Sequence, residues 1–164
     1  MSVLRITALV MSTLSISFPV SAADSNPVQV MSEGSNMVLA LAKLYNNAQG
    51  KMLTNGNASN FGLMACYQID MLNLQVISSN MTLTTTLMAL VMNTSDPTMR
   101  QQTSEILVGA SANLKVSAMS ALATVKMQSD NPLCMDAELQ GINRQADATL
   151  SGIVAVFDTL PNRP

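Results

Sequence analysis

Apolar residues between Phe61 and Asn93 recur every three or four positions, which is the period of an α-helix. They fall into two rows on different sides of such a helix. The first row consists of Met64, Tyr67, Met71, Leu74, Ser78, Met81, Thr85, Met88 and Met92. The second row consists of Ile69, Leu72, Val76, Leu83, Leu87 and Leu90. Two rows require more than one covered face, so we predict that this helix is central in its fold or meets a partner.

Three more helices follow from the same period and from signals at their ends. Gly50 is a typical C-terminal stop, and Asp96-Pro97 combines an N-cap with a first-turn proline. The segment Ser129–Pro132 again combines polar capping residues with a proline, so it marks the end of one helix and the start of the next. The expected helices cover about 35–49, 61–93, 97–128 and 132–159, with a kink or break near 78–80 left open. Because the last three helices have short connections, we predict an all-α, antiparallel, up-down-up-down four-helix bundle.

The first 23 residues have the pattern of a secretory signal peptide. Arg5 precedes the apolar run Ile6–Phe18, and Ser21-Ala22-Ala23 places small residues where a signal peptidase cleaves. The run is shorter than the roughly 20 residues that span a bilayer, and we expect no transmembrane anchor after cleavage. The predicted protein is periplasmic or secreted. Its expected divisions are a cleaved signal peptide at 1–23, an extended lead-in at 24–34, a helical bundle domain at 35–160 and a tail at 161–164.

Cys66 and Cys134 are the two cysteines of the chain. In an oxidising compartment an even number of cysteines indicates a disulfide, and their spacing is not that of a CxxC redox motif. In the predicted bundle both lie near the starts of the second and fourth helices, which are at the same end. We therefore predict a structural Cys66–Cys134 disulfide.

Charge and motifs exclude several classes of function. The formal net charge is −2, and without a basic stripe or many aromatic residues nucleic acid is not an expected partner. Only 11% of residues are charged, against roughly 25% in typical proteins, which favours either a neutral polar surface or one covered by a partner. Histidine is absent, and so are a nucleophile elbow, a P-loop, a dinucleotide fingerprint and HExxH. We expect no enzyme, no catalytic residues and no cofactor.

Asp70 is the single charged residue between Met52 and Ser95. We expect its carboxylate on a solvated face, with a buried functional carboxylate as the alternative. An enzyme would need a pocket around Asp70 or around the tyrosines Tyr45 and Tyr67, which the sequence does not indicate.

We expect the methionines of the chain, 14 in all, mainly to fill the helical core, with a methionine-lined binding groove as a further possibility. Methionine fills cores and also forms adaptable surfaces for apolar partners. Our candidate interaction face is Met64, Tyr67, Met71, Leu74, Met81, Met88 and Met92. The leading hypothesis is an exported, non-enzymatic helical protein that binds another protein as chaperone, inhibitor, immunity or assembly factor, with a homo-oligomer left open. The alternative is a carrier of a small apolar ligand or Cu(I), for which Met88 and Met92 are weak candidate ligands because they share a helix face.

Overall fold

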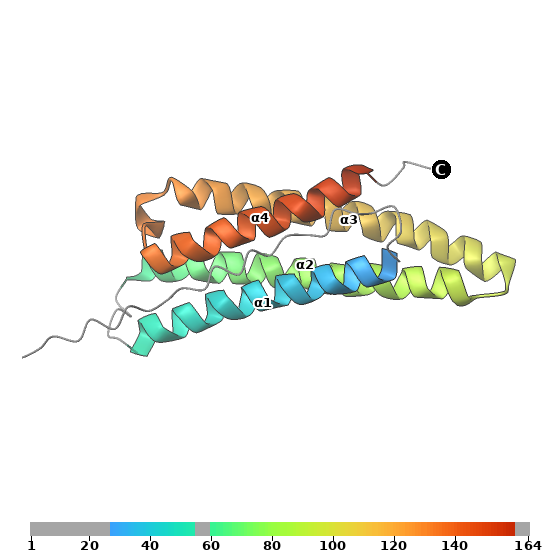
Figure 1. Cartoon of the computed structure of the whole chain (residues 1–164), viewed down its shortest axis with the longest axis horizontal. Coiled ribbons are helices and arrows are strands. Elements are labelled where there is room, and N and C mark those ends of the chain that lie inside the picture. The colour runs from blue at the N-terminus through green and yellow to red at the C-terminus, as the bar shows by residue number, and fades with distance from the viewer. Residues whose placement is uncertain (1–26, 55–59, 160–164) are drawn as a thin grey trace, which may run out of the picture.

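The computed structural model describes residues 27–54 and 60–159, which form an all-helical bundle (Figure 1). The elements are α1 (Pro27–Thr54), α2 (Phe61–Asn93), α3 (Pro97–Ser129), the 3₁₀ turn η1 (Pro132–Cys134) and α4 (Ala137–Thr159). Each α-helix packs against the next along the chain, and α4 also packs against α1. The predicted antiparallel four-helix bundle is confirmed. The predicted signal peptide at 1–23, the first residues of the lead-in and the tail at 161–164 lie outside the described residues.

The first helix begins earlier than predicted. The expected extended lead-in at 24–34 is wrong for residues 27–34, which are helical. Met31 lies in this extra length and is buried, on one helical face with the buried Val38 further along. The hydroxyl of Ser35, directly after the extra length, lies 3.3 Å from that of Ser78 inside the bundle, so both buried hydroxyls have a partner.

The first helix also ends later than predicted. It passes Gly50 and continues to Thr54. Met52 is buried one half-turn beyond that glycine, and Lys51 pairs with Glu138 of α4 at 2.7 Å. Tertiary contacts therefore override the local signal for a helix end.

The second helix has the predicted bounds and runs without a break through residues 78–80. Asn60 caps it by accepting a hydrogen bond from the backbone N–H of Leu63 at 3.1 Å. The hydroxyls of Ser79 and Thr82 donate to backbone carbonyls four residues earlier, at 2.9 and 3.0 Å. The hydroxyl groups of these residues form hydrogen bonds within the helix, so these polar side chains do not interrupt it.

The third helix starts where predicted, because the Asp96 side chain accepts hydrogen bonds from the backbone of Thr98 and Met99. The expected fourth helix is split. Its first residues form η1, and α4 itself begins only at Ala137. Two separate caps explain the split, since Asn131 bonds to the N–H of Leu133 at 3.0 Å and Asp136 bonds to that of Leu139 at 2.9 Å.

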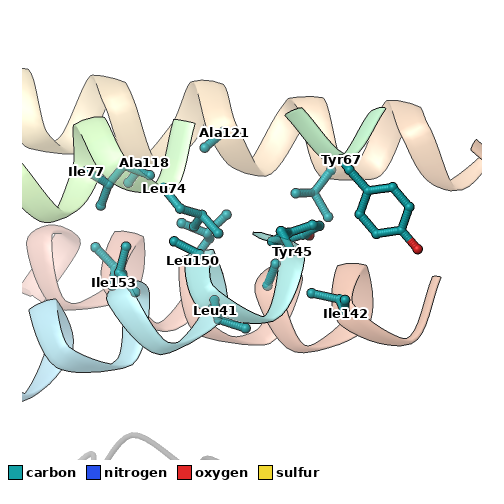
Figure 2. Close-up of a cluster of buried hydrophobic side chains, with 14 of the residues drawn as sticks. Leu41, Tyr45, Tyr67, Leu74, Ile77, Ala118, Ala121, Ile142, Leu150 and Ile153 are labelled. Carbon is teal, nitrogen blue, oxygen red and sulfur yellow. The ribbon is translucent and has the colours of Figure 1, made fainter. Parts of the chain in front are cut away.

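The core runs along the centre of the bundle and takes residues from all four helices (Figure 2). Its largest fully buried side chains include Leu41 and Tyr45 of α1, Leu74 and Ile77 of α2, and Leu150 of α4. On α3 half of the buried hydrophobic residues are alanine, Ala118 and Ala121, beside Leu114 and Val125. Small side chains on α3 permit a close approach between helices.

The helices α2 and α3 extend beyond the other two at one end of the bundle (Figure 1). Val30 near the start of α1, Phe157 near the end of α4 and Met81 of α2 line the same small cavity, so they lie at one level. α2 continues for twelve residues past Met81 to Asn93, which is about 18 Å at 1.5 Å per residue. On α3 the first buried residue is Leu114. We call the projecting part, residues 85–106, the hairpin tip.

Candidate interaction surface

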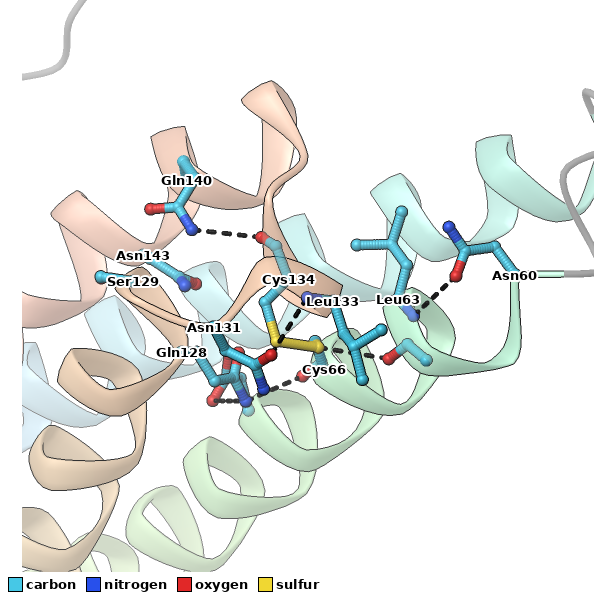
Figure 3. The surroundings of a disulfide bond; sticks show 12 residues. Asn60, Leu63, Cys66, Gln128, Ser129, Asn131, Leu133, Cys134, Gln140 and Asn143 are labelled. Carbon is cyan, nitrogen blue, oxygen red and sulfur yellow. Dashed lines mark hydrogen bonds between the residues drawn. A yellow bond between two sulfur atoms is a disulfide. The ribbon is translucent and has the colours of Figure 1, made fainter.

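The predicted disulfide is present and anchors the end of the bundle opposite the tip (Figure 3). It joins Cys66, in the second turn of α2, to Cys134 in η1, with Cα atoms 5.9 Å apart. The carbonyl of Cys134 also accepts a hydrogen bond from Gln140 Nε2 at 3.1 Å. Cys134 therefore lies before α4 rather than in its first turn, and the disulfide attaches the α3–α4 connection to α2.

The candidate interaction face from the sequence divides into an internal and an external part. Tyr67, Leu74 and Met81 are buried in the bundle core. Met64, Met71 and Met88 are partly buried and pack against that core. Met92, at the hairpin tip, is 61% exposed. The first row thus mainly holds the bundle together, and only its last turns extend past the neighbouring helices.

The second row faces outward. Its members Ile69, Leu72, Val76, Leu83 and Leu90 are each between 46% and 54% exposed, whereas Leu87 is buried. The neighbouring helix carries a similar row that the sequence analysis missed. This outer row of α3 consists of Val108, Ala112, Val116, Met119, Ala123 and Met127, all of them exposed. Successive members of this row are four, four, three, four and four residues apart. This helical spacing is the signal by which the row could have been recognised in the sequence.

Two hollows lie along the α2–α3 pair. The first, of about 300 Å³, is beside the disulfide and is lined by Ala65 and Ile69 from α2 and by Met127 and Leu133 from the other side. The second, of about 510 Å³, is at the hairpin tip. It is lined by Leu90, Asn93, Thr94, Met99 and Thr103. Met99 and Ile106 of the tip are more than half exposed.

Asp70 is not on a solvated face, and that expectation is wrong. Its side chain is 1% exposed, and Gln128 Nε2 donates to its Oδ1 at 3.1 Å. The same Nε2 lies 3.4 Å from the carbonyl oxygen of Cys66. Asp70 Oδ2 and Gln128 Oε1 are buried without a hydrogen-bond partner among the described residues. Burial raises the pKa of Asp70 from 3.8 to about 7, because the charged form loses its hydration.

Two buried tyrosines lie close to this carboxyl group. The rings of Tyr45 and Tyr67 meet edge to face with centroids 6.4 Å apart (Figure 2). Burial, then the charges of Asp70 and Tyr67, raise the pKa of Tyr45 far above 10. Burial also raises the pKa of Tyr67, helped by its hydrogen bond to Asp136. Both phenols therefore stay protonated near neutral pH, and their burial together with Asp70 fits a structural polar cluster better than an accessible catalytic site.

Removing the hydroxyl of Tyr45 should destabilise the fold. That hydroxyl donates to Asn143 Oδ1 at 2.7 Å inside the bundle, and Asn143 Nδ2 already lacks a partner among the described residues. We expect Tyr45→Phe to lower the free energy of unfolding by about 1–3 kcal/mol, the usual effect of stranding a buried polar group. Urea unfolding followed by circular dichroism measures this loss.

Tyr67→Phe is the matched control for this experiment. Its hydroxyl donates to Asp136 Oδ1 at 2.8 Å, but that oxygen also accepts the N–H of Leu139. The carboxylate thus keeps a partner after the substitution, so the loss should be smaller. Equal losses in the two variants would contradict the proposed role of Asn143.

A metal centre has little support in the described residues. They contain no group of three or more histidine, cysteine, aspartate and glutamate side chains placed to hold an ion. Met88 and Met92 are one helical turn apart, but Met88 packs against the core while Met92 is largely exposed.

The two helices that carry the exposed rows also stand out by their hydropathy. α2 and α3 are each long and apolar enough to cross a membrane, a test that core helices of soluble proteins also pass. In the most apolar window of α3 only 17% of the residues are buried within the bundle. Comparison of the chain with protein-family models, with curated proteins and with solved structures found no match. The site must therefore be interpreted from its own chemistry.

Proposed function

We propose that this is an exported, non-enzymatic helical protein that binds another protein through its hairpin tip. The observation that carries the proposal is the projection of α2 and α3 beyond α1 and α4, which leaves Met92, the last residue of the first row, largely exposed. Met92, Met99 and Ile106 are each more than half exposed there. Large apolar side chains exposed in this way are typical of interaction sites.

The chemistry of the tip favours a protein partner. Methionine side chains are flexible and adapt to varied apolar surfaces. The hollow at the tip combines the apolar Leu90 and Met99 with the polar Asn93, Thr94 and Thr103. Protein interfaces have the same mixture of an apolar centre and a polar rim. A chaperone, inhibitor, immunity or assembly role is consistent with such a surface.

Export rests on two supports. The Cys66–Cys134 disulfide indicates a non-reducing environment. The pattern of residues 1–23 supplies the expected signal peptide for a periplasmic or secreted protein.

Site-specific photocrosslinking tests the binding proposal in the cells that produce the protein. We expect p-benzoylphenylalanine at position 92 or 99 to form an adduct with a discrete second protein, identified by mass spectrometry. The matched control is position 39 on α1, where Leu39 is also exposed. Adding Ile106→Glu should reduce the adduct at position 92 about tenfold, since a carboxylate would be desolvated at the interface. Identical adducts at all three positions, or none at the tip, would contradict the proposal.

The alternative, a carrier of a small apolar ligand or Cu(I), has weaker support. The cavity lined by Met31, Met81, Ile153 and Phe157 measures about 10 Å³, enough for about one water molecule. A carrier should show added mass in native mass spectrometry of freshly purified protein, which would favour this alternative over the protein-binding function.

A further inference from the structure

The exposed rows of α2 and α3 form a second surface, which shares only Leu90 with the hairpin tip. We call it the outer face and define it by the exposed members of the second row together with the outer row of α3. We propose that this outer face packs against the same face of a second copy of the chain, giving a two-fold symmetric dimer. The proposal goes beyond the binding function of the tip and does not depend on it.

The two rows lie on the same side of the molecule. Ile69 belongs to the second row and Met127 to the outer row of α3, and both line the hollow beside the disulfide. Because α2 and α3 run antiparallel as packed neighbours, rows that meet at one end continue side by side along the pair. The outer face is therefore one surface rather than two separate stripes.

None of the residues that define the outer face is charged, and the nearby Lys126 pairs with Asp147 of α4 at 3.7 Å. Asp70, the one charged residue between Met52 and Ser95, is buried on the other side of α2. The outer row of α3 consists only of alanine, valine and methionine. When a surface meets a copy of itself, any charge on its axis meets a like charge and is repelled. A neutral face avoids this penalty.

Four exposed members of the second row are arranged symmetrically about one point in α2. Ile69 and Leu90 are equally distant from the bond between residues 79 and 80, and so are Val76 and Leu83. An antiparallel copy can therefore place Ile69 opposite Leu90 and Val76 opposite Leu83, whereas Leu72 lies opposite the position of the buried Leu87. Ser79, at the centre, is small and allows the two helices to approach.

The outer row of α3 has the same symmetry about its own midpoint, between residues 117 and 118. Val108 mirrors Met127, Ala112 mirrors Ala123, and Val116 mirrors Met119. The two midpoints lie at one level of the bundle, because Asn80 Nδ2 donates to Ser117 Oγ at 3.2 Å. A single two-fold axis at that level, in the plane of the face and perpendicular to the helices, would therefore superpose both rows on themselves.

This shared symmetry favours a second copy over other occupants. A two-fold interface uses the same patch on both subunits, so it requires a self-complementary pattern. A lipid surface or an unrelated protein has no such requirement. In the dimer Val76 faces Leu83 of the second copy, and Ile69 faces Leu90 of the second copy.

The outer face is large enough for a specific dimer. Residues 69–90 span about 31 Å, and two neighbouring helices are about 20 Å wide, which gives a projected area of about 600 Å² on each copy. The total of about 1,200 Å² is at the lower end of the range for specific, stable interfaces. We therefore expect a reversible dimer rather than an obligate one.

Sedimentation equilibrium over a dilution series tests the proposal on the mature protein with its disulfide intact. The expected result is a molar mass that rises on concentration to twice that of one chain. Leu83→Glu should increase the dimer dissociation constant on the order of 100-fold, because two carboxylates lose hydration near the axis. Leu39→Glu, at an exposed leucine of α1, is the matched control and should leave the constant unchanged. Far-UV circular dichroism verifies that both variants are folded.

A compensating substitution tests the antiparallel register. Val76→Lys alone should weaken the dimer as Leu83→Glu does. In the double variant, the introduced ammonium at position 76 faces the introduced carboxylate at position 83 of the second copy, so we expect at least tenfold tighter association than in either single variant. Double-variant affinity no better than that of the single variants would overturn this register.

Other outcomes overturn the dimer while leaving the tip proposal intact. A monomer at all concentrations is one, and sedimentation of the monomer with phosphatidylcholine vesicles, abolished by Leu83→Glu, is another that assigns the face to a membrane. Met92 and Met99 do not belong to the outer face, so photocrosslinked adducts at those positions test the tip separately.

Discussion

Removal of the Cys66–Cys134 disulfide is expected to lower the free energy of unfolding by about 4 kcal/mol. The bond joins residues 68 positions apart, and in the chain-entropy model a loop of that size restricts the unfolded ensemble by about this amount. Small domains are stable by only about 5–15 kcal/mol, so the loss is a large fraction of the total. In the folded protein, η1 would lose its covalent attachment to α2.

Urea unfolding of the double variant Cys66→Ala/Cys134→Ala measures this loss without leaving a free thiol. Leu133→Ala is the matched control, because Leu133 lies in the same turn and is largely exposed. We expect the control to change stability by less than about 1 kcal/mol. A double variant as stable as that control would show that the disulfide does not stabilise the native fold.

Much of the fold was predictable because the chain marks its helices with local chemistry. The bounds of α2 follow from the apolar period, and the start of α3 follows from Asp96-Pro97. The disulfide followed from combining the cysteine count with the order of the helices, since Cys66 and Cys134 come to the same end only if the helices alternate in direction. Agreement between these independent signals is what made the bundle a sound prediction.

The bounds of α1 and α4 were less predictable because tertiary contacts decide them. Burial of Met31 and Met52 extends α1 at both ends. The disulfide and the separate caps Asn131 and Asp136 divide the expected fourth helix into η1 and α4. The burial of Met31 and Met52 and the disulfide depend on residues far apart in the sequence, whereas the two caps act on residues two and three positions later and are local signals.

The orientation of α2 also could not be predicted from hydropathy. The first row includes Ser78 and Thr85, yet it faces the core, whereas the purely aliphatic second row is mostly exposed. The reason is that α1, α3 and α4 cover the first row, and Ser78 is satisfied there by Ser35. The candidate interaction surface therefore had to be reassigned from the middle of the first row to its end and to the outer face.

Asp70 should make the protein less stable as the pH rises from about 4 to about 7. Its pKa is near 3.8 in the unfolded chain and is raised to about 7 in the folded protein by burial. Between those values the folded state binds more protons than the unfolded state, so this contribution to stability falls with pH and is constant above about 7. The maximum slope is about 1.4 kcal/mol per pH unit for a single group.

Replacement of the acid by its amide isolates this contribution. Asp70→Asn stays neutral at every pH and keeps an oxygen for the Nε2 of Gln128, which donates to Asp70 Oδ1 in the native protein. We expect its free energy of unfolding, measured in urea across that pH range, to become larger than that of the unmodified protein as the pH rises to 7 and above. Glu105→Gln, at an exposed carboxylate of α3, is the control for removing one negative charge.

The test compares how the free energy of unfolding depends on pH in Asp70→Asn and in the unmodified protein. Both proteins contain the same other carboxylates, so the difference between the two profiles isolates Asp70. A protonated Asp70 also has an O–H donor, and Gln128 Oε1 is a buried acceptor without a described partner, so the neutral acid suits this site better than the anion. Parallel profiles for Asp70→Asn and the unmodified protein would mean that Asp70 is already ionised in the folded bundle at low pH. That outcome would require a compensating positive group beside α2, and the buried cluster of Asp70, Gln128 and Tyr45 would have to be reassigned.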